Sequence, residues 1–281
     1  LGMSFPILIK MISGDHENIG KGIGLIYGVN TIGAIFGSLL TGFLLLPKLG
    51  VQQSLLLIAT LNLIVMMYLF RTSTYLTTTL RKIMTLGLAG IILTVNMGMP
   101  SDLLDQFFMR DSAGRKDMHK LLFFEEGLTD TVAVFEDNYG VLDPDAKRLV
   151  TNGLSMSAVN FIASRYMKLL AHIPILLKDN PEDILVICFG TGQTTGAAAA
   201  HPKVKSVDSV DLSESVVKAG SIFSLQNYNA LRNEKVKIIL QDGRNHLLTT
   251  RKMYDVITSE PPPPRTAFTV NLYTKEYYEI A

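Results

Sequence analysis

Apolar residues collect in the first hundred positions of the chain, where few charges interrupt them. Three stretches carry no charged residue at all: 22–47, 49–70 and 83–101. Each is near or above the ~20 residues that cross a bilayer core. We therefore expect transmembrane helices over about 22–46, 51–70 and 83–99, with a partial helix over 1–12. The alternative is a set of helices buried inside a soluble protein.

Beyond position 100 the pattern changes to short β-rich runs and then to strands that alternate with helices. Residues 101–120 are polar and mixed in charge, which favours a linker or an amphipathic segment. The β-rich runs that follow, together with the turn dipeptide Asn152-Gly153, predict a small β-hairpin subdomain over 121–157. Residues 158–281 predict a helix over 158–177, kinked or ended near Pro174, and then an α/β domain with a parallel sheet.

Residues 183–211 carry the most specific pattern: a strand, a glycine turn, a helix, and an acid at the end of the next strand. The turn consists of Gly190, Thr191, Gly192 and Gln193. Glycine lets the backbone approach a ligand closely, and a helix N-terminus presents free N–H groups to it. Asp211 follows about 20 residues beyond the first glycine, where a carboxylate can accept both ribose hydroxyls. The pattern predicts binding of an adenosine-containing cofactor.

Two further strands of the predicted sheet also end in acids. The strand over 235–240 runs into Gln241-Asp242-Gly243, and the strand over 254–258 runs into Ser259-Glu260. Because parallel strands end at one edge of a sheet, we expect all three acids around one ligand. Asp211 suits the ribose, Asp242 the adenine amino group, and Glu260 the transferred group. The alternative for any one of these acids is a helix N-cap or a solvated loop residue. Three acids in order after a glycine turn favour the ligand site.

Charge and composition exclude several other classes. Residues 1–100 carry six Lys/Arg and two Asp/Glu, and the remainder carries 20 and 23, without a basic stripe for nucleic acid. The single cysteine, Cys188, falls in a predicted buried strand, which argues against disulfides and against a metal cluster. Five scattered histidines give no paired zinc spacing. We therefore expect neither a metal nor a nucleic-acid partner.

These motifs resemble the spermidine synthase (aminopropyltransferase) family, within the class I S-adenosylmethionine-dependent methyltransferase fold. More closely, the chain resembles the bacterial membrane-fused spermidine synthase-like proteins. The resemblance covers roughly 121–281 and rests on these motifs: residues 190–193, the strand end at Asp211, 241–244, 254–257 and 272–278. It implies an N-terminal transmembrane α-helical segment, a small β-hairpin subdomain and an α/β Rossmann-like methyltransferase fold. We expect a fragment that is C-terminally truncated, because the chain ends inside a predicted helix.

The resemblance also implies roles for individual residues. In the family, an acid in the glycine loop binds the aminopropyl amine of decarboxylated S-adenosylmethionine, and Thr191 stands there in this chain. The family's strand-end motif has two aspartates, one of which deprotonates the attacking amine; here Glu260 and Pro263 take those positions. Glu260 is thus the implied catalytic residue and Tyr273 an implied substrate contact. The implied cofactor-binding residues are Gly190, Thr191, Gly192, Gln193, Asp211, Asp242 and Gly243.

The implied function is a membrane-anchored transferase of polyamine biosynthesis, which moves an aminopropyl group from decarboxylated S-adenosylmethionine to a putrescine-like amine. The two lost acids make intact S-adenosylmethionine more plausible as the co-substrate than in the core family. An S-adenosylmethionine-dependent methyltransferase and a non-catalytic nucleoside-binding membrane protein therefore stay open as alternatives. The expected partners are a small amine and the lipid bilayer, and homo-oligomerisation is left open. We expect the protein to be located in the bacterial inner membrane, with its transferase domain in the cytoplasm.

Overall fold

A computed structural model of the protein describes residues 19–72, 77–100, 119–127, 129–137, 146–264, 266 and 269–281. The chain divides into two compact units, Leu1–Met99 and Pro100–Ala281. The partial helix expected over 1–12 lies outside the described residues, as does the expected linker up to position 118.

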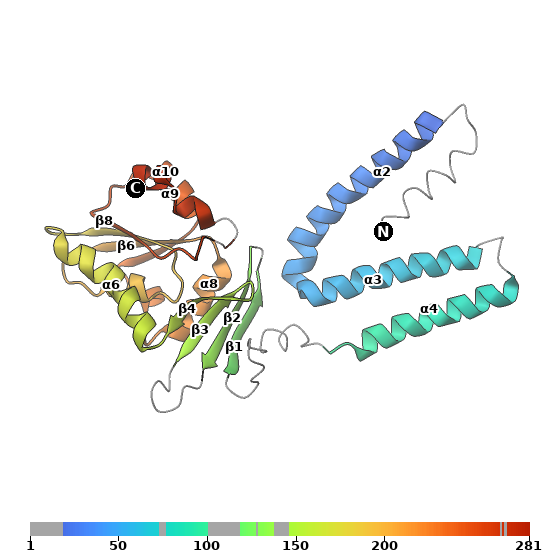
Figure 1. The fold of residues 1–281 in the computed structure, drawn as a ribbon, viewed down its shortest axis with the longest axis horizontal. Coiled ribbons are helices and arrows are strands. Elements are labelled where there is room, and N and C mark those ends of the chain that lie inside the picture. Colours follow the sequence, from blue (N-terminus) through green and yellow to red (C-terminus); the bar gives the residue numbers. More distant parts are fainter. Residues whose placement is uncertain are drawn as a thin grey trace. The chain divides into compact units, whose positions relative to one another are not determined.

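The first unit is helical throughout its described part (Figure 1). Its elements are α2 (Ile19–Leu40), the π-helical turn η2 (Thr41–Leu45), α3 (Leu46–Thr72) and α4 (Thr78–Gly98). The helical run breaks at Gly50, whose φ of 75° is disfavoured for a residue with a Cβ. This kink falls between the first two spans expected from the sequence. Thr77 caps α4 by accepting a hydrogen bond from the N–H of Leu80.

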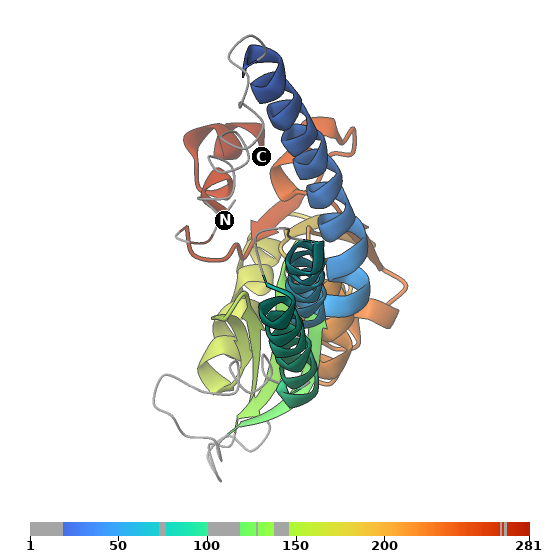
Figure 2. The ribbon, with the colours of Figure 1, turned by 90° about the vertical axis from the view of Figure 1, so that its right-hand side faces the viewer.

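Helices α3 and α4 lie side by side in both views (Figures 1 and 2). One polar contact joins them: the side-chain amide of Asn96 donates to the hydroxyl of Thr60 at 3.0 Å. Two stretches, Gly20–Thr72 and Thr78–Gly98, are long and apolar enough to cross a membrane. Core helices of soluble proteins have the same length and composition, so these properties alone do not place the helices in a bilayer.

The second unit begins with a four-stranded antiparallel sheet in the order β1-β2-β3-β4. Its strands are β1 (His119–Glu126), β2 (Thr131–Asp137), β3 (Lys147–Thr151) and β4 (Leu154–Val159). The predicted turn joins β3 to β4, with φ of 51° at Asn152 and 77° at Gly153. The subdomain is therefore larger than a hairpin. Strand β1 begins within the expected linker, and β4 ends two residues beyond the expected boundary at 157.

The helix expected from position 158 begins later, as α6 (Phe161–Leu177). Ala158 and Val159 still pair with β3, and the side chain of Asn160 caps the helix by accepting from the N–H of Ala163 at 2.8 Å. Pro174 lies inside the last turn of α6, and the helix ends three residues later.

A parallel sheet follows, as the sequence predicted, and its strands lie in the order β7-β6-β5-β8. Its strands are β5 (Asp183–Ile187), β6 (Ser206–Asp211), β7 (Val236–Leu240) and β8 (Val256–Ser259). The connecting helices are α7 (Gln193–Ala199), α8 (Glu214–Ala219) and α9 (Gly243–Thr249), and α10 (Lys275–Ile280) follows the turn η7 (Thr269–Leu272).

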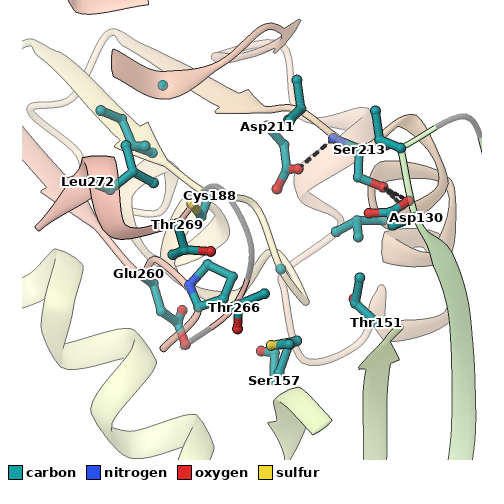
Figure 3. Close-up of a pocket in the computed structure, with 18 of the residues that line it drawn as sticks. Asp130, Thr151, Ser157, Cys188, Asp211, Ser213, Glu260, Thr266, Thr269 and Leu272 are labelled. Atoms are coloured by element: carbon teal, nitrogen blue, oxygen red, sulfur yellow. Dashed lines mark hydrogen bonds between the residues drawn. The ribbon is translucent and has the colours of Figure 1, made fainter. Parts of the chain in front are cut away.

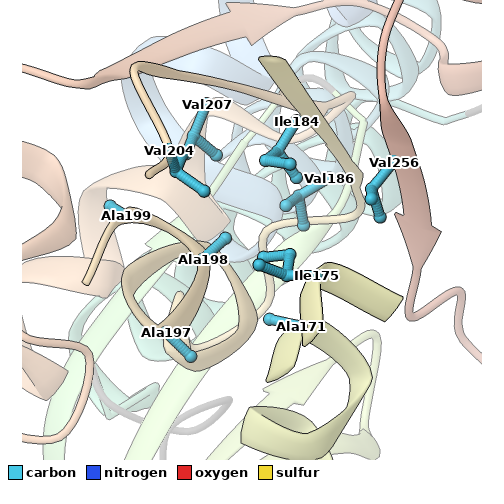
Figure 4. Packing of buried hydrophobic residues seen from close by; sticks show 10 residues of the cluster. All are labelled: Ala171, Ile175, Ile184, Val186, Ala197, Ala198, Ala199, Val204, Val207 and Val256. Atoms are coloured by element: carbon cyan, nitrogen blue, oxygen red, sulfur yellow. The ribbon is translucent and has the colours of Figure 1, made fainter. Parts of the chain in front are cut away.

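The side chains of successive β5 residues pack on opposite faces of this sheet. Ile184 and Val186 join a cluster with α6 and α7, where Ala171 and Ala198 allow close helix packing (Figure 4). Leu185 and Ile187 belong to a second cluster, which includes Tyr277 of α10. Burial on both faces explains the continuous apolar run of this strand.

The antiparallel sheet packs on the helix that follows β6. Val132, Val134 and Leu149 form one cluster with Val216 of α8 and the nearby Phe223. This packing holds the antiparallel sheet beside the carboxyl ends of the parallel strands, where ligands bind in open α/β sheets.

Candidate active site

A cavity of about 360 Å³ lies between the antiparallel sheet and the carboxyl ends of the parallel strands (Figure 3). Four carboxylates line it: Asp130 from the β1–β2 connection, and Asp211, Asp242 and Glu260 from the ends of β6, β7 and β8. Among the described residues no Lys, Arg or His lines the cavity. The volume falls within the range of small-molecule sites, and the charge favours a cationic ligand.

The glycine turn forms one wall of the cavity with its backbone. Gly190 lines the cavity with a φ of 53°, and Gly192 has a φ of 79°. A Cβ on Gly192 would lie 2.6 Å from Cζ of Phe189, so this position requires glycine. Cys188, expected inside the strand, instead follows β5 at a φ of 71° and lines the cavity.

Thr191 and Gln193 face away from the cavity. Each residue is 1% exposed, and the Gln193 amide donates to the hydroxyl of Thr191 at 3.0 Å and to the carbonyl of Ala158 at 3.1 Å. The amide of Asn227 donates to the carbonyl of Thr191 at 3.0 Å. Of the four turn residues predicted to bind the cofactor, only Gly190 lines the cavity. The side chains of Thr191 and Gln193 instead hold the turn in place from beneath.

Asp211 ties the end of β6 to the glycine turn. Its Oδ2 accepts from the N–H of Phe189 at 2.7 Å, and its Oδ1 accepts from the N–H of Ser213 at 2.9 Å. Burial raises the pKa of the Asp211 carboxyl, and these backbone hydrogen bonds partly oppose that shift. Because each carboxylate oxygen has two acceptor sites, Asp211 retains capacity for ligand hydroxyls.

Asp242 is both the N-cap of a helix and a residue that lines the cavity. Its Oδ1 accepts from the N–H of Asn245 at 2.8 Å, which makes it the N-cap of α9. It also lines the cavity, together with the adjacent Gly243. A Cβ at Gly243 would collide with a methyl group of Ile187, so the helix can begin this close to the sheet only with glycine there.

Glu260 is held from two helices. The Tyr166 hydroxyl of α6 donates to its Oε1 at 2.5 Å, and the Thr194 hydroxyl of α7 lies 3.3 Å from its Oε2. Burial raises the pKa of the Glu260 carboxyl, and the hydrogen bonds from both hydroxyls oppose the shift. Burial and the neighbouring Glu260 also raise the pKa of Tyr166. The result is a fixed carboxylate with a raised proton affinity, facing the cavity.

Tyr273, predicted to contact substrate, does not line the cavity. Its hydroxyl instead lies 2.9 Å from the carbonyl oxygen of Pro261 and 3.1 Å from that of Pro262. A tyrosine hydroxyl has one proton to donate, and both carbonyl oxygens lie within its reach. The structure thus connects Tyr273 to the proline loop after Glu260.

Sequence reasoning missed three polar residues at this site. Asp130 accepts from the hydroxyl of Ser213 at 2.9 Å, and burial raises the pKa of its carboxyl. Tyr166 belongs to an apolar-periodic helix with no local motif. Thr266 lines the cavity, and its buried Oγ1 has no hydrogen-bond partner among the described residues. The described residues hold no group of three or more His, Cys, Asp or Glu suited to a metal ion.

Comparisons with known proteins match this part of the chain to one family. Residues 163–281 match the spermine/spermidine synthase domain. A polyamine aminopropyltransferase of Oceanobacillus iheyensis is 24% identical over 99% of this chain and 53% of its own length. The corresponding enzyme of Methanocaldococcus jannaschii is 36% identical over 41% of this chain and 39% of its own length. The chain therefore spans about half the length, or less, of these relatives.

A solved structure supports the same fold. A spermidine synthase, crystallised with the transition-state analogue AdoDATO, aligns with a TM-score of 0.51 at 20% identity. The alignment covers 57% of this chain and 53% of that one. Together, the matched domain and the relatives confirm the resemblance, and residues 163–281 of this chain are similar to the spermine/spermidine synthase domain.

Proposed function

We propose that the protein is a transferase that moves an aminopropyl group from decarboxylated S-adenosylmethionine to an amine. One observation supports this most strongly: four carboxylates and no described basic residue line a single cavity. Both reactants are cations, since the donor carries a sulfonium and an ammonium group and the acceptor an ammonium group. A cavity of this charge lowers the cost of bringing them together.

The donor's nucleoside fits the side of the cavity formed by β6 and β7. In this proposal Asp211 accepts the ribose hydroxyls, Asp242 accepts from the adenine amino group, and Gly190 allows the ligand to approach the backbone closely. The assignment is supported by the lining of the cavity, which includes all three residues. Intact S-adenosylmethionine adds a carboxylate, which would find four acids and no described basic side chain. This contrast favours the decarboxylated donor.

Glu260 has the geometry of a general base. The acceptor ammonium gives a proton to Glu260, and the free amine attacks the propyl carbon bonded to sulfur. The new C–N bond forms as the C–S bond breaks, and the C–S electron pair returns to sulfur as a neutral thioether. That leaving group needs no acid, so the work of the site is alignment and proton removal. The hydroxyls of Tyr166 and Thr194 fix the carboxylate for this step.

Methyl transfer is the second candidate function. Thr191 is neutral and faces away from the cavity, so this loop offers no acid to the donor's terminal amine. A donor labelled separately in its methyl group and in its propyl carbons distinguishes the two reactions. Propyl label in the amine product supports aminopropyl transfer, whereas methyl label there would overturn it.

Replacing Glu260 by Gln tests the assignment of the base. We expect donor affinity to stay within about twofold and turnover to fall about 100-fold or more, a typical loss when a general base is removed. Retained turnover in this variant would contradict the role of Glu260.

We further propose that residues 1–100 anchor the protein in the bacterial inner membrane, with the transferase domain in the cytoplasm. The most apolar windows of the two long helical stretches are only 6% and 0% buried, unlike core helices of soluble proteins. The Oceanobacillus relative matches 99% of the chain, including this part. With the transferase domain in the cytoplasm, Arg71, Arg81 and Lys82 would lie on the outer side of the membrane. Basic residues between membrane spans usually lie on the cytoplasmic side, so these three residues are exceptions to that tendency. Carbonate extraction of membranes tests anchoring: the protein should stay in the pellet, and release into the supernatant would contradict it.

A further inference from the structure

The two sides of the cavity differ in charge. In Figure 3, Asp211, Ser213 and Asp130 occupy one side, where hydrogen bonds join Ser213 to both acids. Glu260 lies on the other side, together with Thr266. If the donor's nucleoside occupies the side of Asp211, the acceptor must approach the side of Glu260. This assignment rests on the proposed function.

We propose that the acceptor is a primary monoamine, whose amino group is held by Glu260 and Thr266 and whose remainder carries no charge. The remaining described lining residues after Glu260 are neutral: Pro262, Thr266, Thr269 and Leu272. The sequence from 261 to 275 contains no Asp or Glu. Glu260 is therefore the single carboxylate that this part of the chain offers to an acceptor.

Burial of a second ammonium group here would be unfavourable. A charged group that leaves water without a partner loses its hydration and regains nothing. An uncharged alkyl chain, by contrast, is stabilised by contact with the ring of Pro262 and the side chain of Leu272. The same wall therefore favours a monoamine over a diamine of equal length.

Thr266 supplies the second contact. Its Oγ1 is buried, lines the cavity, and has no hydrogen-bond partner among the described residues. Buried hydroxyls normally have a partner, so an unpartnered one in a binding cavity points to a ligand. A primary amine that has given one proton to Glu260 still has N–H groups, and Oγ1 of Thr266 can accept one of them.

Butylamine and putrescine test the acceptor class, because both have a four-carbon chain and only putrescine has a second amino group. Each is assayed with full-length protein in detergent and saturating decarboxylated S-adenosylmethionine. We expect kcat/KM for butylamine to exceed that for putrescine about tenfold or more. The second ammonium group of putrescine would be buried without a partner, and a site discriminates strongly against such a group. Equal or better use of putrescine would overturn the inference but leave aminopropyl transfer intact. No transfer to either amine would overturn the proposed function as well.

Thr266→Val tests the hydroxyl contact at nearly constant side-chain volume. We expect KM for butylamine to rise about fivefold to tenfold, the usual effect of one lost hydrogen bond. Donor affinity should stay unchanged, which also reports that the variant is folded, and Thr266→Ser should restore KM. Thr249→Val, on the exposed part of α9, is the matched control. An unchanged KM in Thr266→Val would contradict the contact.

Asp130→Asn tests an alternative arrangement, in which a diamine spans the cavity and its second ammonium group binds Asp130. We expect the ratio of kcat/KM for the two amines to be the same in this variant as in the parent protein. The contrary result is that the parent protein prefers putrescine and the Asp130→Asn variant does not. That result would place a second ammonium group at Asp130 and overturn the monoamine inference.

Discussion

Tyr166 and Glu260 are 94 positions apart in the sequence, and their side chains meet in a hydrogen bond of 2.5 Å. The contact joins α6 to the loop after β8. It fixes one oxygen of the carboxylate that faces the cavity, while Thr194 approaches the other. A base held in this way loses little orientational freedom in the reaction.

Tyr166→Phe should shift the pH dependence of turnover. The Tyr166 hydroxyl stabilises the charged form of Glu260 and so lowers its pKa; removing it raises that pKa. Since turnover requires deprotonated Glu260, the acidic limb of the kcat profile should move to higher pH. At a pH on that limb we expect a loss of about tenfold. Tyr278→Phe, an exposed phenol on α10, is the control. An unmoved limb would contradict the coupling.

Binding of the donor should release protons. Burial raises the carboxyl pKa of Asp211 and Asp130, which lie on the donor's side, so the empty cavity holds protons there above the ordinary carboxyl range. A cationic ligand favours the charged acids and expels those protons, so affinity should rise with pH through the raised pKa values. Calorimetry in buffers of different ionisation enthalpy measures the release. Net proton uptake would contradict this charge assignment.

The same shifts give the empty protein a pH-dependent stability. The folded state binds more protons than the unfolded chain between the ordinary and the raised carboxyl pKa values. The free energy of unfolding from these groups therefore decreases as pH rises through that window, and is highest below it. Saturating donor should remove the part of this decrease that Asp211 and Asp130 contribute, which thermal melts at several pH values would show.

Gly192→Ala should destabilise the glycine turn more than Gly190→Ala does. Both positions have a positive φ, but only at Gly192 would a Cβ lie as close as 2.6 Å to another side chain, that of Phe189. We expect a loss of about 1–3 kcal/mol at Gly192 from strain and crowding, against about 1 kcal/mol at Gly190 from φ alone. Thermal denaturation checks the order. Equal melting temperatures for the two variants would contradict it.

Tyr273→Phe should loosen the proline loop without touching the donor's side of the cavity. It removes the hydroxyl that lies within hydrogen-bond distance of the carbonyls of Pro261 and Pro262. We expect KM for the amine to rise about threefold to tenfold, the scale of one net hydrogen bond, with donor affinity unchanged. Steady-state kinetics with each substrate varied separate the two effects. A weakened donor affinity would instead place Tyr273 in the nucleoside site.

Local signals were sufficient for the centre of the domain. The apolar run of β5, the glycine turn and the position of Asp211 follow from backbone geometry within a short segment. The convergence of Asp242 and Glu260 on the same cavity followed from parallel topology, because such strands end at one edge. These parts depend on short-range rules, and the structure has them where the sequence indicated.

Side-chain direction and long-range pairing were harder to predict. Thr191 and Gln193 belong to the expected turn, but its left-handed glycines direct both side chains beneath it rather than into the cavity. Tyr166 and Asp130 reach the site only through tertiary packing, which no local pattern encodes. Asn160 did carry a usable signal, since an Asn before an apolar helix is a common N-cap.

Titration of the full-length protein in detergent with decarboxylated and intact S-adenosylmethionine, side by side, tests aminopropyl transfer most directly. Four carboxylates without a described basic residue should bind the decarboxylated donor about tenfold more tightly or better, because only the intact form brings a carboxylate into that cavity. Tighter binding of the intact form would contradict aminopropyl transfer and support methyl transfer.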